Sequence, residues 1–180
     1  MGDPRTGSPV DAPDRIDHRA IARWLPRFRR VGRLFRHEVH GLQHIPVEGA
    51  GLIVLNHGPV EIGAFLLYAE IGLRLGRHPR FLGERLFFEN PRVARILERG
   101  GVLEGTPGHA RRKFDEGELV AVFPGGAREA WKPFRERATV RWAGREGFAR
   151  VAFEAVEPII PVACPASDSL YVVVNDGFAW

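Results

Sequence analysis

The sequence predicts an α/β domain in which helices flank a central, mostly parallel sheet, with a basic amphipathic helical segment at the N-terminus. Two short apolar runs, Leu52–Leu55 and Leu119–Phe123, have the length and composition of buried parallel strands. Between and after these runs lie longer segments whose apolar residues recur at helical spacing. Such an alternation of strands and helices is typical of layered α/β folds.

The expected elements follow one another along the chain, separated by turn residues. In order, they are strand 52–55, helix 59–76, helix 91–99, helix 107–116, strand 119–123, helix 142–156, strand 158–163 and strand 170–174. Gly100 and Gly117 stand where two of these helices should end, because glycine commonly closes a helix. Pro59 is expected at a first helical position, where its missing N–H does no harm.

The first 37 residues divide into two parts. Residues 1–14 are rich in Pro, Gly and Asp, which predicts a disordered leader. Segment 15–37 carries eight arginines around an apolar stripe formed by Ile16, Ala20, Trp24, Phe28, Val31 and Phe35. Pro26 is expected to split this segment into two short helices, since proline is tolerated only in a first turn. The remaining residues, 38–180, form the predicted folded domain.

Segment 15–37 has the composition of a helix that lies on a membrane surface. Arginines on one side, with Trp, Phe and Leu on the other, favour interfacial binding. Two alternatives remain open: an arginine-rich helix packed on the domain, or a nucleic-acid-binding helix. We expect no nucleic-acid partner, because no recognised nucleic-acid module follows.

Composition narrows the class of protein further. A length of 180 residues fits one domain, and the formal net charge is +4. Cys164 is the single cysteine, which excludes an internal disulfide and any multi-cysteine metal site, and suits a reducing cytoplasm. No apolar run approaches the roughly 18 residues of a transmembrane helix, and the N-terminus lacks the apolar core of a signal peptide. We therefore expect peripheral contact with a membrane, if there is contact at all.

The first candidate site is the run Asn56-His-Gly-Pro-Val-Glu61, directly after strand 52–55. Ligand sites in α/β sheets gather at strand ends. His57 would be exposed there, and Glu61 could approach its ring. A histidine held by a carboxylate can act as a general base, because the acid fixes the tautomer and stabilises the imidazolium. The alternative is that Glu61 caps a helix and His57 is an ordinary loop histidine.

The second candidate site is Phe123-Pro-Gly-Gly-Ala-Arg-Glu129, directly after strand 119–123. Gly125 and Gly126 let the backbone approach a ligand, and a helix beginning beyond them would offer N–H donors to an anion. Arg128 adds a planar cation that suits phosphate or carboxylate. The alternative is a plain strand-to-helix turn with Arg128 and Glu129 solvated.

Together with two further blocks, these motifs resemble the glycerolipid acyltransferase superfamily. The blocks are Val39-His-Gly-Leu-Gln-His-Ile-Pro46, the NHG run, FPGGARE, and REGFARVAFEAVEPIIPV ending at Val162. The glycine pair of FPGGARE is similar to the mono- and diacylglycerol acyltransferase-like branch, whereas the phosphatidate-forming branch usually has FPEGTR. Each block is short, but their common order makes the resemblance specific.

The resemblance implies an O-acyltransferase that moves a fatty acyl group from acyl-CoA or acyl-ACP to a lipid hydroxyl. His57 matches the catalytic histidine, which deprotonates the acceptor. Arg128 matches an arginine associated with acceptor or cofactor binding, and Gly125 and Gly126 match the turn that shapes the pocket. Asn56 and Glu129, beside these residues, are expected to line the substrate site. The reaction needs no metal and no cofactor, and the enzyme is expected at the cytoplasmic face of the membrane.

Two departures from the family pattern affect the expected substrate and base. The family's usual aspartate partner would fall at Ile62, so Glu61, one residue earlier, is expected to take the orienting role. Block Gly101–Pro107 lacks the arginine of the phosphate-acceptor branches, which favours a neutral glyceride or a long-chain alcohol as acceptor. A lysophosphatidate or glycerol-phosphate acyltransferase, or an inactive lipid-binding member, are the alternatives. A hydrolase is disfavoured because no GxSxG motif is present. Two interpretations of the chain's end remain open: a compact member of the superfamily, or a domain that is C-terminally short.

Overall fold

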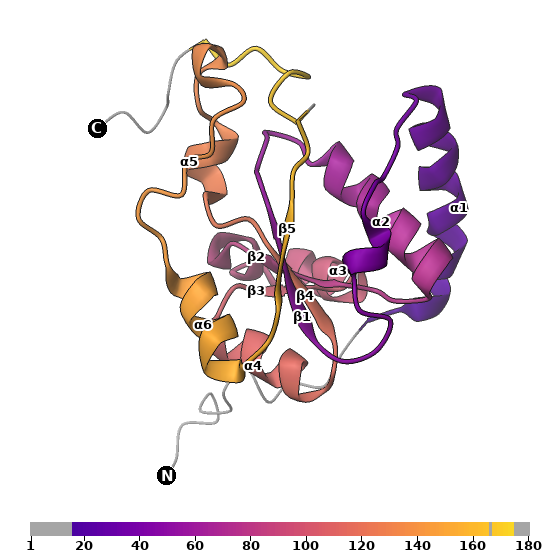
Figure 1. Ribbon diagram of the computed structural model, residues 1–180. Coiled ribbons are helices and arrows are strands. Elements are labelled where there is room, and N and C mark those ends of the chain that lie inside the picture. The colour runs from indigo at the N-terminus through magenta and orange to yellow at the C-terminus, as the bar shows by residue number, and fades with distance from the viewer. Residues whose placement is uncertain (1–15, 166, 175–180) are drawn as a thin grey trace.

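The computed structural model describes residues 16–165 and 167–174, and these form an α/β domain. The described strands make one five-stranded sheet of order β3-β2-β4-β1-β5, and every neighbouring pair is parallel (Figure 1). The strands are β1 (Gly51–Leu55), β2 (Arg80–Gly83), β3 (Val102–Glu104), β4 (Leu119–Val122) and β5 (Ile159–Val162). The predicted fold class is therefore confirmed.

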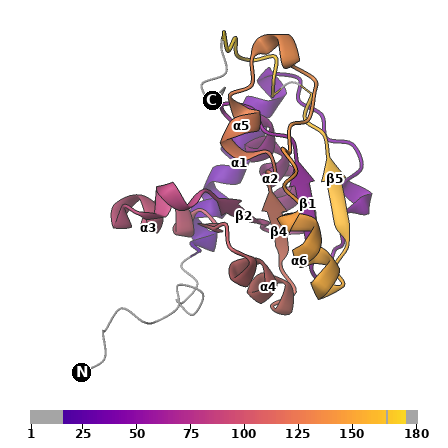
Figure 2. The same ribbon diagram turned by 90° about the vertical axis from the view of Figure 1, so that its left-hand side faces the viewer.

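The described α-helices lie on both faces of this sheet and around its ends. They are α1 (His18–Leu34), α2 (Ile62–Leu75), α3 (Pro91–Arg99), α4 (Pro107–Asp115), α5 (Gly126–Ala130) and α6 (Gly147–Ala155). Short 3₁₀ turns lie at Leu42–His44, Arg85–Phe88 and Phe134–Glu136. Helix α2 packs on one face of the sheet, α4 and α6 pack on the other, and α1 lies outside α2 (Figures 1 and 2).

Strand β1 explains why the sheet is buried on both sides. Its residues point alternately to opposite faces, as strand geometry requires. Ile53 and Leu55 pack in the cluster that includes α2, whereas Leu52 and Val54 pack in the cluster that includes α4 and α6. All of β1 is buried, and β4 beside it is buried too. Burial on both faces explains why the sequences of β1 and β4 are apolar throughout, and these apolar runs are the pattern from which the two strands were predicted.

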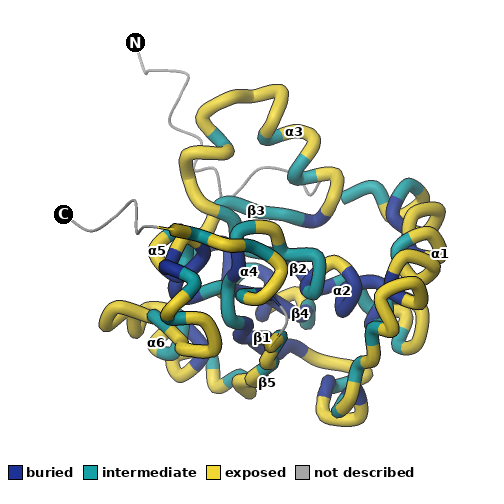
Figure 3. Tube along the Cα trace, turned by 90° about the horizontal axis from the view of Figure 1, so that it is seen from above, coloured by how far each residue is buried: buried dark blue, intermediate teal, exposed yellow. Residues whose placement is uncertain are grey.

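Helix α1 corrects two of the expectations for segment 15–37. The helix runs without a break through Pro26, because Ile21 and Leu25 bury their side chains against α2 and hold the turns around the proline in place. The predicted apolar stripe is also rotated. The buried residues are Ile21, Leu25 and Gly32, while Trp24 is 55% exposed. Ile16 and Phe28 of the predicted stripe are nevertheless partly buried against the same cluster, so the prediction is right in part. Figure 3 shows buried, intermediate and exposed positions following one another along α1.

The starts of two helices and one predicted strand also differ from prediction. Helix α2 begins at Ile62, so Pro59 lies in a loop and not at a first helical position. Helix α6 begins at Gly147, because Ala143 and Gly144 adopt positive φ values of 51° and 70° that interrupt a helix. Residues 170–174 form no strand, and Val173 instead accepts a hydrogen bond from the Phe134 N–H at 2.9 Å.

Two strands were not predicted, whereas other elements match closely. Strands β2 and β3 have four and three residues, too few for a periodic pattern. Helix α3 has its predicted bounds, ending at Gly100, and Gly117 follows α4 with φ of 72°. The predicted leader, residues 1–14, lies outside the described residues. Among the residues the structure describes, no helix is both long and apolar enough to cross a bilayer.

Candidate active site

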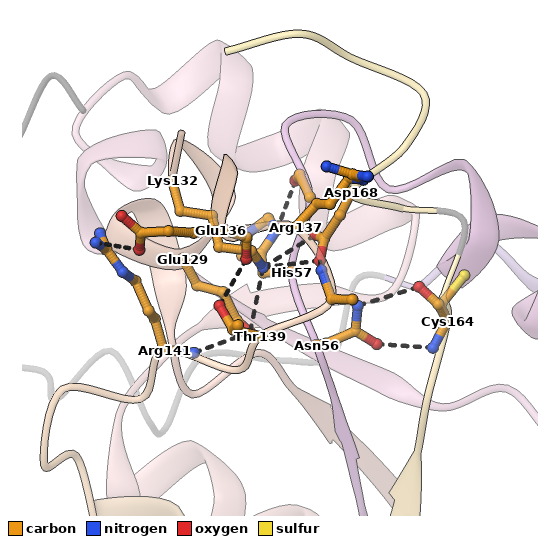
Figure 4. Close-up of polar contacts among 12 residues, drawn as sticks. Asn56, His57, Glu129, Lys132, Glu136, Arg137, Thr139, Arg141, Cys164 and Asp168 are labelled. Carbon is orange, nitrogen blue, oxygen red and sulfur yellow. Dashed lines mark hydrogen bonds and ion pairs between the residues drawn. The ribbon is translucent and has the colours of Figure 1, made fainter. Parts of the chain in front are cut away.

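The candidate site lies where the carboxyl ends of three neighbouring strands meet. His57 follows β1, the Gly125–Glu129 segment follows β4, and Cys164 follows β5. Because β4, β1 and β5 are parallel neighbours, these three chain segments meet at one edge of the sheet. Figure 4 shows the side chains that they bring together.

His57 and Glu61 are in direct contact in the loop before α2. The His57 Nδ1 lies 2.9 Å from the Glu61 Oε1, and the two side chains are 24% and 10% exposed. Nδ1 also lies 2.8 Å from the Gly58 carbonyl oxygen. A carboxylate and a carbonyl can only accept hydrogen bonds, so Nδ1 must carry the proton. Nε2 of the neutral ring is therefore an unprotonated base.

Glu61 accepts hydrogen bonds from both the His57 ring and the backbone of the loop that carries it. The same Oε1 also accepts a hydrogen bond from the Gly58 N–H, which ties the carboxylate to the loop that carries the histidine. The Glu61 backbone stands at the N-cap of α2, but its side chain makes no capping hydrogen bond. The helix-cap alternative therefore does not describe this side chain, and the loop geometry is that of a histidine oriented by a carboxylate.

An aromatic wall and a close backbone contact surround His57. The Phe123 ring centroid lies 4.6 Å from that of His57. On the other side, the loop at Gly58 touches the backbone of Ser167, so closely that a Cβ at position 58 would lie 2.6 Å from the Ser167 carbonyl oxygen. Glycine is required here because any side chain would collide with backbone.

Asn56 joins the ends of β1 and β5. Its Nδ2 donates to the Cys164 carbonyl oxygen at 3.1 Å, and its Oδ1 accepts from the Cys164 N–H at 2.7 Å. Both ends of the side-chain amide are thus occupied by backbone. The predicted role of Asn56 in substrate binding stays a prediction, whereas its role in holding the two strand ends together follows from these bonds.

The glycine pair forms a tight turn packed by its neighbours. A Cβ at Gly125 would overlap the Glu129 side chain and lie 2.7 Å from the Arg141 carbonyl oxygen, and Gly126 has a φ of 53°. Arg145 Nη1 donates to the carbonyl oxygens of Pro124 and Gly125 at 3.4 and 3.3 Å. The close approach that the two glycines permit is thus made by other parts of the chain.

Arg128 and Glu129 point into different surroundings. Arg128 is exposed, which leaves its guanidinium open to a ligand. Glu129 is fully buried, contrary to the solvated alternative. Burial raises the pKa of the Glu129 carboxyl, and the charge of Lys132, the Arg141 N–H and the charge and N–H of His57 oppose that rise. Helix α5 has only five residues, so it offers no extended N-terminal anion site.

Sequence reasoning missed two buried residues beside the site, Lys132 and Asp168. Lys132 Nζ lies 3.0 Å from the Asp168 Oδ1, and both side chains are less than a tenth exposed. The spacing of three residues between Glu129 and Lys132 is a weak signal that could have indicated their proximity. Nothing in the sequence links either of them to Asp168, because 36 residues separate Lys132 from Asp168.

Comparisons with known proteins agree with this arrangement. Residues 36–165 match the profile of the Acyltransferase family. The chain is similar to the "DGAT1/2-independent enzyme synthesizing storage lipids" of Bos taurus, at 35% identity over 126 residues, 70% of this chain and 37% of that protein. The Homo sapiens protein of the same name is 35% identical over 126 residues, 70% of this chain and 39% of its own length.

A bacterial relative covers more of the chain. An uncharacterized protein of Mycobacterium tuberculosis is 32% identical over 163 residues, 87% of this chain and 44% of that protein. The chain thus spans about two fifths of the length of these curated relatives. No solved structure matches.

The family match covers the candidate site as well as the sheet. It begins before β1, ends after β5, and contains both His57 and the Gly125–Glu129 segment. The resemblance to the glycerolipid acyltransferases, which rested on four short blocks, is therefore confirmed by a match over most of the domain. This chain belongs to the acyltransferase family.

Proposed function

We propose that this protein transfers a fatty acyl group from an acyl thioester, acyl-CoA or acyl-ACP, to the hydroxyl of a neutral lipid, with His57 as general base. The observation that carries the proposal is the pair of acceptors around His57 Nδ1, the Glu61 carboxylate at 2.9 Å and the Gly58 carbonyl at 2.8 Å. They hold the proton on Nδ1 and leave Nε2 free to accept one from a substrate hydroxyl.

The reaction then proceeds in two steps. Nε2 takes the proton of the acceptor hydroxyl while the hydroxyl oxygen bonds to the thioester carbonyl carbon. The tetrahedral intermediate collapses as its C–S bond breaks, and the departing thiolate receives the proton from the imidazolium. The products are an ester, a free thiol and neutral His57. Glu61 stabilises the imidazolium between the steps, and such base catalysis typically contributes about a hundred- to ten-thousandfold in rate.

The neutral acceptor is supported by the relatives and by the sequence. The eukaryotic relatives are named as enzymes that synthesise storage lipids. Block Gly101–Pro107 also lacks the arginine expected of phosphate-acceptor branches. We therefore take a mono- or diacylglycerol, or a long-chain alcohol, as the acceptor class.

We further propose that α1 brings the enzyme to the cytoplasmic face of a membrane. The described arginines of this segment are all exposed: Arg19, Arg23, Arg27, Arg29, Arg30, Arg33 and Arg36. Trp24, Leu34 and Phe35 are exposed beside them, at 55%, 81% and 61%. Phe28 stacks on Phe65 of α2 at 6.0 Å, four residues after Glu61. A bilayer bound through α1 would thus lie close to the chain that carries the base.

Acyl transfer from labelled acyl-CoA or acyl-ACP to a panel of acceptors tests the enzymatic proposal. The panel holds a monoacylglycerol, a diacylglycerol, a long-chain alcohol, lysophosphatidate and glycerol 3-phosphate, each offered in liposomes or detergent. The variants are His57→Ala and Glu61→Gln. The exposed pair His40 and Glu38, 3.2 Å apart, provides matched controls as His40→Ala and Glu38→Gln.

We expect transfer to a neutral acceptor that falls at least about a hundredfold in His57→Ala and less in Glu61→Gln, with both controls unchanged. A wild-type protein that acylates only the phosphate-bearing acceptors would overturn the neutral-acceptor assignment. Release of fatty acid without any acceptor would indicate a hydrolase. If wild type transfers no acyl group with any donor and acceptor, the enzymatic proposal fails, and the protein is a lipid-binding member without turnover.

Flotation with vesicles tests the membrane proposal separately. Wild type should float with phosphatidylcholine vesicles that contain phosphatidylserine, and less as salt rises, because exposed arginines are screened. The double variant Trp24→Ser, Phe35→Ser should float less, whereas Phe153→Ser, at an exposed position on α6, should float like wild type. Equal flotation of all three proteins would contradict the role of α1.

A further inference from the structure

Glu129 carries a buried carboxylate, and several parts of the chain are arranged around it. It is fully buried, although an ionised carboxylate loses much hydration when buried. Gly125 makes room for it, because a Cβ there would overlap the Glu129 side chain. The Arg141 N–H donates to Glu129 Oε1 at 3.4 Å, and Lys132 Nζ lies 3.9 Å from the same oxygen. Three separate features of the chain thus serve this one carboxylate.

Lys132 and Asp168 extend the cluster toward the chain after β5. Lys132 Nζ contacts both carboxylate oxygens of Asp168 at 3.0 Å. The Asp168 Oδ2 also accepts from the Ala138 N–H at 3.0 Å. Lys132 is 3% exposed at its side chain and Asp168 8%. The cluster therefore ties together the end of α5, the loop near residue 138 and the segment after β5 (Figure 4).

Two segments that belong to this cluster pack against the loop that carries His57. The Phe123 ring, in the segment that leads to Glu129, lies 4.6 Å from the His57 ring, so this segment packs against the histidine. Burial raises the pKa of Glu129, and the charge and backbone N–H of His57 are among the weaker causes that oppose the rise. On the other side, Ser167, the neighbour of Asp168, has its backbone against Gly58. The loop that carries His57 is thus held between segment 123–129 and the Ser167–Asp168 segment.

We propose that Glu129, Lys132 and Asp168 form a buried positioning unit for His57, which fixes the histidine loop and places a second carboxylate beside the imidazolium. This inference deepens the proposed function and rests on it. Of the described charged groups, Glu61 contacts the His57 ring at 2.9 Å, and Glu129 is buried on α5, in the segment whose Phe123 packs against that ring. Lys132 faces Glu129 in turn, and Asp168 holds Lys132 in place. Glu129 is a positioning residue, since it acts on substrate only through His57.

Three substitutions test the unit without large changes of volume: Glu129→Gln, Lys132→Met and Asp168→Asn. Glu154→Gln is the matched control, because Glu154 lies on α6 and pairs with Arg111 at the surface. Each protein is characterised by thermal unfolding, by kcat and KM with the acceptor found for wild type, by the pH profile of kcat, and by NMR of the His57 ring as pH is varied. The His57 signals are assigned with His57→Gln.

A carboxylate beside His57 favours the protonated ring, so its removal should move the ring's titration midpoint to lower pH. In Glu129→Gln we expect this shift, a matching shift of the acid limb of kcat, and a kcat about tenfold lower with KM within about twofold. Lys132→Met and Asp168→Asn should lower kcat as well. Their double variant should be no worse than the poorer single one, because both break the same pair. Glu154→Gln should match wild type throughout.

A purely structural cluster gives a different result. Folded Glu129→Gln and Asp168→Asn proteins with wild-type kcat and an unmoved His57 titration would overturn the proposal. If Glu129→Gln fails to fold, the kcat and KM of Asp168→Asn, at the rim of the cluster, test the proposal instead. A lower kcat supports the positioning unit, and a wild-type kcat overturns it. NMR needs no turnover, so a His57 midpoint that moves in a protein inactive on every acceptor would refute the acyl transfer and uphold the positioning unit.

Discussion

The loop that carries His57 and helix α1 are held to the domain in opposite ways. Around His57, polar side chains bond to backbone, charges are buried, and glycines let segments touch. Helix α1 contacts the domain through an apolar seam of Ile21 and Leu25 against Tyr68 and Ala69, while its arginines and several large apolar side chains are exposed. The first region is fixed from many directions, whereas α1 is held mainly by this seam and, at its N-cap, by the ion pair of Asp17 with Arg99 of α3.

This difference indicates which properties each region can support. A base must be held within a fraction of an ångström, which many short bonds achieve. A helix that binds a bilayer needs a free surface, so one buried seam is enough. Substitutions should therefore separate the two regions cleanly. In α1 substitutions at the seam should affect folding most, whereas near His57 even an added methyl group should matter.

The largest effect on stability is expected at the seam of α1. Leu25 is 4% exposed, and Leu25→Ala should lower the free energy of unfolding by about 2–5 kcal/mol, because it removes buried apolar contact and leaves a cavity. Trp24→Ala, one residue away and at an exposed position, should change it by less than about 0.5 kcal/mol. Urea unfolding of both variants provides the measurement. Similar losses in the two variants would show that α1 is buried by another face.

The next effect should appear beside His57. Gly58→Ala pushes a Cβ against the Ser167 backbone, which cannot rotate away, and should cost about 1–3 kcal/mol of unfolding free energy. The same shift displaces His57, so acyl transfer should fall too. Gly147→Ala is the control, because a Cβ at the start of α6 meets nothing within 4 Å. If Gly58→Ala and Gly147→Ala have the same free energy of unfolding, the loop that carries His57 is loosely held.

The contrast between the regions also explains what could be predicted from sequence. The strands β1 and β4, the helix α3 and the His57–Glu61 pair depend on local patterns, namely apolar runs, a proline after an N-cap, and residues four apart. The rotation of α1 and the positions of Lys132 and Asp168 depend on partners far along the chain. Trp24 and Leu25 are equally apolar in the sequence, and only the fit against α2 distinguishes them.

A smaller effect, of opposite sign, is expected at Pro26. Proline inside a helix lacks the N–H that would bond to the Ala22 carbonyl, so Pro26→Ala should raise the free energy of unfolding by about 1 kcal/mol, part of the gain being lost to a freer unfolded chain. Pro91→Ala should bring no gain, because Pro91 is at the first turn of α3, where proline fits. A loss of stability in Pro26→Ala, by thermal unfolding, would show that α1 needs the proline for its shape.

The smallest effect concerns His78, a partly buried histidine beneath α1. Burial, and to a lesser degree the nearby His18 charge, lower the pKa of His78 below its ordinary value near 6.5. The His78 ring lies against His18 of α1 and Tyr68 of α2, at centroid distances of 5.6 and 5.8 Å. The unfolded chain therefore binds a proton at a higher pH than the folded chain does. Stability is fully present above about pH 6.5 and is lost as pH falls toward the lowered folded value.

Thermal unfolding between pH 7.5 and 5.5 measures this loss. His78→Gln should lose less stability over that range than wild type, because it has no proton to take up on unfolding. His40→Gln, at an exposed position, should lose as much as wild type. His37, which contacts the other part of α1, also has a pKa lowered by burial, so some loss should remain in His78→Gln. An equal loss in His78→Gln and wild type would mean that α1 leaves His78 hydrated, and that its seam is looser than the buried Leu25 implies.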